Sequence, residues 1–252
     1  MKKLQFILIL FIGFWGFSQN QSLFELGNKA YNEGAYQDAV KHYQQILNNG
    51  EHSAELYYNL GNTYYKLNEI APSIYYYEKA LLLNPSDSDI KNNLVYAKNM
   101  TLDAIAILPE TGLTKIYKSA TSYFSFEEWA YVSVVFMFLF VLCYLLYYFL
   151  RYATHKRIAF VAGLLCLIIA LITIGIAYSK YKIFSSDQPA IVFDKEVILK
   201  SEPNTTSAET FRLHEGTKVF ILDQLGEWKK IKIADGKTGW LIDQSIKPLK
   251  DF

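Results

Sequence analysis

LYYNLGNTYYKLN, residues Leu56–Asn68, has the pattern of one amphipathic helix but carries a glycine at position 61. A glycine inside a helix costs about 1 kcal/mol relative to alanine, so its presence needs a reason. The upstream stretch LFELGNKAYNEGAYQDA, residues 23–39, places Gly27 at the equivalent position, 34 residues before Gly61. A period of this length is typical of repeats built from pairs of helices.

Other positions repeat in the same register: Leu26 with Leu60 and Leu94, Asn28 with Asn62, Tyr31 with Tyr65, and Tyr43 with Tyr77. Each unit divides into two helices, the second beginning near Tyr36 in one copy and near Pro72 in the next. A glycine allows two helices to approach closely. We therefore expect Gly27 and Gly61 at the helix crossings, opposite Ala39 and Ser73, with Tyr43 and Tyr77 filling the adjoining space.

The second copy resembles the tetratricopeptide repeat through Tyr57, Leu60, Gly61, Tyr64, Ala80 and Pro85. The resemblance implies an all-α array over residues 23–100, closed by a capping helix at Ser88–Met100. Because two repeats and a cap are few, a partner or a second copy of the chain is expected to complete the stack.

In such repeats the first helix of each pair lines a concave, partner-binding groove. The resemblance assigns that groove to Asn28, Tyr31, Asn32, Tyr58, Asn62, Tyr65 and Lys66; the alternative is that several of the tyrosines are packing residues. Phe24, Asp89 and Asn93 occupy positions where the carboxylate-binding subtype has lysine or arginine. Capture of a C-terminal carboxylate is therefore not predicted.

The composition argues against several function classes. A net charge of +1 over 252 residues provides no basic surface for nucleic acid. The only cysteines, Cys143 and Cys166, lie in apolar runs, so neither a disulfide framework nor a thiolate zinc site is predicted. Phosphate-binding, dinucleotide-binding and hydrolase motifs are missing from the sequence, and its four histidines are scattered. We predict a non-enzymatic scaffold without a cofactor or metal.

The N-terminus predicts export. Lys2 and Lys3 precede an uncharged run, and the small residues Gly16 and Ser18 follow it, as in a signal peptide over residues 1–18. The alternative, an uncleaved signal anchor, also places the following segment outside the cytoplasm. The motif LPETG at residues 108–112 resembles a sortase signal, but 95 residues follow Arg157, so it is not interpreted as one.

Two uncharged runs, 129–150 and 159–178, have the length of membrane-spanning helices. The signal peptide places their connecting loop, 151–158, in the cytoplasm and both folded domains in the periplasm. Cys143 and Cys166 lie eight and nine residues from that loop's arginines and are expected at similar depth. Residues 101–128 are predicted to form a linker with an amphipathic helix in the membrane interface, whose apolar face contains Leu113, Ile116, Tyr117, Ala120, Tyr123 and Phe124.

Short alternating runs and the turn Asp235-Gly236 predict a small all-β barrel over residues 189–250. The run GEWKKIKIADGKTGW, residues 226–240, resembles the bacterial SH3 domain. This resemblance implies binding of cell-wall peptides or protein segments, with Trp228 and Trp240 as candidate contacts. The alternative is that one or both tryptophans belong to the core.

The order of these modules is similar to that of BatE-like members of the Bacteroides aerotolerance (Bat) family of Bacteroidota. The resemblance implies an inner-membrane location and two kinds of partner, membrane proteins of the von Willebrand factor A type and a MoxR-like ATPase. It also implies a role in aerotolerance or envelope maintenance. Two functions are left open: a membrane adaptor that holds partner proteins, and a tether or sensor that binds peptidoglycan.

Overall fold

The computed structural model describes residues 20–105 and 112–250. The predicted signal peptide and most of the LPETG motif lie outside the described residues. The chain divides into two compact units, Met1–Leu108 with Gln188–Phe252, and Pro109–Asp187. The first unit therefore contains both the N-terminal helices and the C-terminal strands.

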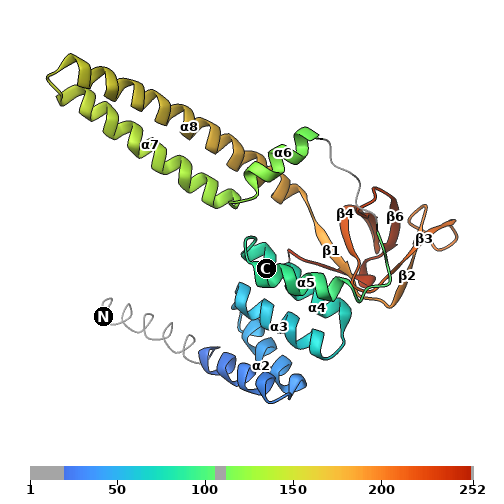
Figure 1. Ribbon diagram of the computed structural model, residues 1–252. Helices are drawn as coiled ribbons and strands as arrows, with labels where there is room; N and C mark the ends of the chain where they lie inside the picture. The colour runs from blue at the N-terminus through green and yellow to red at the C-terminus, as the bar shows by residue number, and fades with distance from the viewer. Residues whose placement is uncertain (1–19, 106–111, 251–252) are drawn as a thin grey trace, which may run out of the picture. The chain divides into compact units, whose positions relative to one another are not determined.

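The N-terminal part of the first unit is a series of helical hairpins (Figure 1). Residues 20–32 are helical, and the next helices are α2 (Tyr36–Asn48), α3 (Ala54–Lys66), α4 (Ile70–Leu83) and α5 (Ser88–Lys98). Ser53 caps α3 by accepting a hydrogen bond from the Leu56 amide. Helix α4 begins two residues before Pro72, so the proline lies in the first turn, where its missing N–H leaves no bond unmade.

Each repeat glycine faces a tyrosine ring from the second helix of its pair. A Cβ atom on Gly61 would lie 2.6 Å from Tyr77 Cδ1, and a Cβ atom on Gly27 would overlap the ring of Tyr43. Ser73 Oγ also donates to the Gly61 carbonyl oxygen over 2.9 Å. Glycine is required because the tyrosine ring occupies the space that any side chain would need.

The C-terminal part of the first unit is a seven-stranded antiparallel sheet in the order β3-β2-β6-β5-β4-β1-β7. Its strands are β1 (Pro189–Val192), β2 (Glu196–Lys200), β3 (Glu209–His214), β4 (Lys218–Leu225), β5 (Trp228–Lys232), β6 (Thr238–Ile242) and β7 (Ile246–Pro248). The turn Asp235-Gly236 joins β5 and β6, and Gly236 has a φ of 89°, which glycine adopts without strain. Leu199, Ile231 and Leu241 are fully buried in the core.

The barrel packs against the helical array through α4, which the sequence pattern does not indicate. Ile191 of β1 and Leu249 lie in the same apolar cluster as Ile74 and Tyr75 of α4. The same cluster contains Ile90, Leu94 and Ala97 of α5, the helix that ends the array. The barrel therefore adds its contacts to α4 beside those made by α5.

The second unit contains α6 (Gly112–Thr121), α7 (Phe126–Phe149) and α8 (Ala153–Ser186). Helices α7 and α8 run antiparallel side by side (Figure 1), and each is long and apolar enough to cross a membrane. The expected capping box of Ser125 and Glu128 is present at the start of α7. Lys180 Nζ donates to the Thr121 carbonyl oxygen over 2.7 Å, which ties the end of α6 to α8.

The helices extend beyond the predicted apolar runs: α7 begins at Phe126 and α8 continues to Ser186. Helix α8 begins at Ala153 and so includes most of the segment expected as a loop, because residues 153–158 contain neither glycine nor proline to stop a helix. Helix α6 ends at Thr121, so Tyr123 and Phe124 follow the helix instead of lying on its apolar face.

Candidate functional site

The predicted groove residues line two adjoining hollows on the helical array. The first has a volume of about 340 Å³, and the second about 220 Å³. Tyr31 and Asn62 line both, so the two hollows form one groove. The first is lined by Asn28, Tyr31, Asn32, Tyr43, Glu55, Asn59 and Asn62, and the second by Tyr31, Asn62, Tyr65, Lys66, Tyr77, Asn93 and Tyr96.

Tyr58 is the one predicted groove residue that lines neither hollow. It is half-buried, packs against the core of the array, and its hydroxyl accepts a hydrogen bond from Asn93 Nδ2 over 3.0 Å. Tyr31 and Tyr65 also pack against the core while lining the groove. Tyr31 and Tyr65 therefore have both of the roles that the sequence left open: they pack against the core and also line the groove.

The first layer of the groove is a hydrogen-bonded group of one tyrosine and two asparagines. The Tyr43 hydroxyl donates to Asn28 Oδ1 over 2.6 Å. Asn59 Nδ2 donates to the same oxygen over 3.0 Å. Both acceptor positions of the Asn28 carbonyl oxygen are therefore used, which fixes the orientation of its amide.

The second layer repeats this group one period later in the chain. The Tyr77 hydroxyl donates to Asn62 Oδ1 over 2.6 Å, and Asn93 Nδ2 donates to it over 2.8 Å. The amino groups of Asn28 and Asn62 are thus held in equivalent orientations at neighbouring positions along the groove. They can donate to acceptors on a ligand, such as peptide carbonyl oxygens.

The tyrosine hydroxyls of both layers remain protonated donors. Burial raises the pKa of Tyr43 to about 12, and it also raises the pKa of Tyr77. Among the residues that line the groove, Glu55 and Lys66 are the ionisable ones with opposite charge. The groove is therefore polar and close to neutral, which suits a ligand recognised by hydrogen bonds more than by charge.

The predicted groove set does not include Tyr43, Glu55, Asn59, Tyr77, Asn93 and Tyr96. Two of these, Asn59 and Asn93, occupy positions at which the carboxylate-binding subtype holds its ligand. A signal for part of this set was present, because Asn59 and Asn93 are 34 residues apart, as are Asn28 and Asn62. The 34-residue spacing pairs Tyr43 with Tyr77 and predicts only that they pack. Their rings do pack, and their hydroxyls reach the groove.

Trp228 and Trp240 lie on the outer face of the barrel. Both are half-buried and alternate along their strands with the buried residues Lys229, Ile231 and Leu241. Trp228 is directly opposite Ile242 across the β5–β6 pair. Neither tryptophan therefore belongs to the buried core of the barrel.

Trp240 lies between two lysines from neighbouring strands. It is paired in register with Lys230 of β5 and with Lys200 of β2, and Lys230 Nζ lies 6.0 Å from the centre of its ring. A ligand that stacks on Trp240 would meet a positively charged edge.

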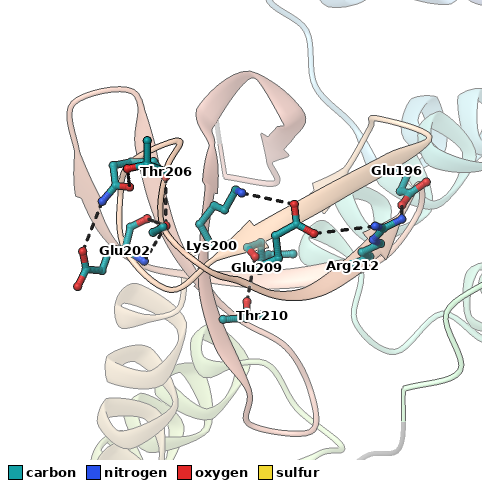
Figure 2. Close-up of polar contacts among 10 residues, drawn as sticks. Glu196, Lys200, Glu202, Thr206, Glu209, Thr210 and Arg212 are labelled. Atoms are coloured by element: carbon teal, nitrogen blue, oxygen red, sulfur yellow. Dashed lines mark hydrogen bonds and ion pairs between the residues drawn. The ribbon is translucent and has the colours of Figure 1, made fainter.

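Part of that charge is compensated by a ladder of ion pairs on the β2–β3 hairpin (Figure 2). Lys200 Nζ lies 3.5 Å from Glu209 Oε1, and Arg212 lies 3.9 Å from the other oxygen of Glu209. Arg212 also contacts Glu196 over 2.7 Å. The charges of this ladder neutralise one another. Lys230 lies beside Trp240 but is not part of the ladder.

Two family models match the chain. The tetratricopeptide repeat model matches residues 54–87, which contain α3 and α4, and the bacterial SH3 domain model matches residues 195–247, which contain β2–β6. No curated protein matches the chain. Domains of these two kinds are typically interaction modules without catalytic activity. The chain therefore combines a tetratricopeptide-like helical array, two long apolar helices and an SH3-like all-β domain.

Proposed function

We propose that this protein is a non-enzymatic membrane scaffold whose groove holds an extended segment of a partner protein. The observation that supports this function is the repeated tyrosine–asparagine layer. It presents the amino groups of Asn28 and Asn62 at successive positions along a groove, and an extended chain offers its carbonyl oxygens at regular intervals.

The proposed ligand is an internal segment of the partner. The groove contains Lys66 but lacks a cluster of cations among its lining residues, so it has little to attract a terminal carboxylate. Tyr31, Tyr65 and Tyr96 give it aromatic surface for the apolar side chains of such a segment.

We further propose that the scaffold belongs to a Bat-type complex in the inner membrane, with von Willebrand factor A-type membrane proteins and a MoxR-like ATPase as partners. The order of the modules supports this assignment. The signal-like N-terminus supports a periplasmic location for both folded modules. The two apolar helices fit a membrane hairpin anchored in the lipid bilayer.

The test is crosslinking of the full-length protein in membranes, followed by quantitative identification of its partners. Asn28→Ala with Asn62→Ala should remove most of the partner recovered by the unmodified protein. Asn48→Ala with Asn92→Ala is the matched control, because both asparagines are exposed and outside the groove. Equal recovery with the two double variants would contradict the adaptor function, provided that both retain the helix content of the parent.

The second candidate function is peptidoglycan binding by the barrel, favoured by the half-buried, outward-facing Trp228 and Trp240. Trp240→Ala should then reduce retention of the full-length protein on purified sacculi, while the groove variants should not. Retention that is unaffected by both Trp228→Ala and Trp240→Ala would exclude this face of the barrel as a cell-wall site.

A further inference from the structure

The first helical hairpin leaves its outer face uncovered. The hairpin consists of the helix at residues 20–32 and α2, and within the described residues no hairpin precedes it. Leu26 and Leu60 occupy equivalent positions one period apart, but Leu26 is 45% exposed and Leu60 is fully buried. Leu60 is buried because it shares an apolar cluster with Ala39 and Ile46 of α2. The first hairpin therefore covers the second, while the same face of the first hairpin is open.

The second helix of this hairpin, α2, shows the same difference. Tyr76 of α4 packs against the first hairpin, and its hydroxyl accepts a hydrogen bond from Gln44 Nε2 of α2 over 2.5 Å. His42 is the equivalent residue one period earlier, and its Nδ1 atom is buried without a hydrogen-bond partner among the described residues. Buried polar atoms are ordinarily hydrogen-bonded. The outer face of the first hairpin thus lacks the contacts that a preceding hairpin would supply.

This outer face is hollowed and carries balanced charges. The hollow has a volume of about 380 Å³, and none of the residues that line the groove lines it. Its lining includes two carboxylates, Glu33 and Asp38, and two lysines, Lys29 and Lys41. The carboxylates lie at the turn of the hairpin, and the lysines lie one helical turn further from it. Because each lysine pairs with the carboxylate of its own helix, these four charges cancel.

A row of carboxylates beside a row of lysines is complementary to a second copy of itself. A two-fold axis between the two rows turns the lysines of one copy onto the carboxylates of the other. The same axis brings Leu26 of each copy towards Ala35 of the other, since the two residues are almost equally far from that axis along the chain. Charge and apolar surface therefore fit the same pairing.

The opposite end of the array does not offer a matching surface. The exposed residues of α5 at three- and four-residue spacing include the polar Ser88, Lys91 and Asn92, followed by Val95. A polar outer face of this kind is typical of a repeat that ends an array. A head-to-tail contact would therefore place Leu26 against polar side chains, and it would continue as a filament because each copy keeps a free end.

We propose that two copies of this chain pair through the outer faces of their first hairpins in a closed, two-fold contact. Each first hairpin takes the place that a preceding repeat would have on the other copy, so the two arrays form one stack. The contact uses residues other than those of the groove, and the pair therefore presents two grooves to partner segments.

The experiment photo-crosslinks the full-length protein in membranes. The photoreactive amino acid p-benzoylphenylalanine replaces Lys41, whose side chain is 72% exposed on the outer face, and two differently tagged copies of the chain are co-expressed. We expect a product of twice the monomer mass that carries both tags. The absence of such a product would overturn the proposal, whether the probe reacts instead with residues 1–19 of its own chain, with another protein or with nothing.

The same probe in place of Lys91 is the matched control. Lys91 is an exposed lysine of α5, at the polar end of the array, and the probe at this position should give no dimer. Dimer formed equally well from Lys91, with or without a ladder of larger products, would overturn the two-fold contact. This control also separates contact at the first hairpin from pairing of the chains elsewhere, for example through their apolar helices.

A substitution in the face tests the contact itself. Leu26→Glu should lower the yield of dimer from the Lys41 probe by about tenfold, because each copy loses an apolar contact and gains a charge. Val95→Glu changes a comparably exposed residue of α5 and should leave the yield unchanged. Circular dichroism checks that both variants keep the helix content of the parent. Equal yields from the two folded variants would overturn the role of this face.

Discussion

Lys218 of β4 donates to Glu78 of α4 over 2.6 Å and so links two modules that are 140 residues apart in the sequence. Lys98 of α5 contacts the other oxygen of Glu78 over 2.7 Å. Glu78 is 6% exposed, and this carboxylate is therefore both buried and fully paired. Burial alone raises the pKa of Glu78, but the two lysines outweigh it and hold the pKa below its ordinary value.

A second polar contact joins the same two modules. The Asp103 carboxylate accepts hydrogen bonds from the His214 amide over 2.7 Å and from the Thr217 hydroxyl over 2.6 Å. Its other oxygen lies 2.7 Å from His214 Nδ1. Burial raises the pKa of Asp103, while these bonds lower it by more, so the net pKa lies below its ordinary value. Both carboxylates stabilise the interface in their ionised form.

Removing the charge of Glu78 should weaken the contact between the barrel and α4. In Glu78→Gln, Lys98 and Lys218 lose their counter-charge at a partly buried site, and we expect a loss of about 1–3 kcal/mol in the free energy of unfolding. Thermal unfolding of the purified full-length protein, followed by tryptophan fluorescence, to which Trp228 and Trp240 of the barrel contribute, measures this loss. Lys41→Gln, which breaks the exposed pair with Asp38, is the control and should change little. A similar small change in both variants would show that the link is not stabilising.

The interface should weaken in acid. A carboxylate whose pKa is lowered on folding stabilises the folded state above its unfolded pKa of about 4, and this stabilisation is lost as the pH falls through its folded pKa. The midpoint of thermal unfolding of the parent should therefore fall below about pH 4 more steeply than that of Glu78→Gln. The difference between the two proteins should be largest near neutral pH and shrink in acid. Parallel curves would contradict the role of Glu78 as an ionised anchor.

The helix crossing at Gly61 should tolerate alanine only if the side chain of Tyr77 is replaced by a smaller one. Because an added Cβ would lie 2.6 Å from the Tyr77 ring, Gly61→Ala should destabilise the protein by about 1–3 kcal/mol through overpacking. Combining it with Tyr77→Leu should cost less than the sum of the two single changes, as measured by a double-mutant cycle of denaturant unfolding. Additive effects would mean that the ring does not determine the choice of glycine.

Both modules should lie on the same side of the membrane, because the contact between Glu78 and Lys218 needs them together. External protease added to spheroplasts is expected to cut both the helical array and the barrel, which corresponds to the proposed periplasmic location. Protection of both would reverse the orientation of the hairpin. Cleavage of one alone would contradict the interface itself.

Much of the local structure could be predicted from the sequence, because it depends on spacing along the chain. The matches between Gly27 and Gly61, and between Asn28 and Asn62, reveal the repeat without any knowledge of contacts. The hairpin turn at Asp235-Gly236 and the capping box at Ser125 are equally local signals. The lengths of the two apolar runs are sufficient to predict α7 and α8.

The functional arrangement of these elements depends on tertiary packing. The sequence placed Tyr43 and Tyr77 in the core, but only the folded hairpin shows that their hydroxyls reach Asn28 and Asn62 and fix the amides of the groove. Likewise, the lengths of α7 and α8 follow from counting residues, whereas the register of the two helices depends on contacts such as the hydrogen bond from Ser133 Oγ to the Ala170 carbonyl oxygen.

Spacing along the chain is sufficient to predict the modules, whereas the contact between the barrel and α4 depends on tertiary packing. Ile191, Leu249 and the Glu78–Lys218 pair form this contact. That a partner or a second copy of the chain completes the helical stack stays a prediction. The contact between the barrel and α4 joins residues far apart in sequence and depends on complementary shape and charge. Neither property leaves a periodic signal in the sequence, whereas the 3.6-residue period of each helix and the alternation of each strand do.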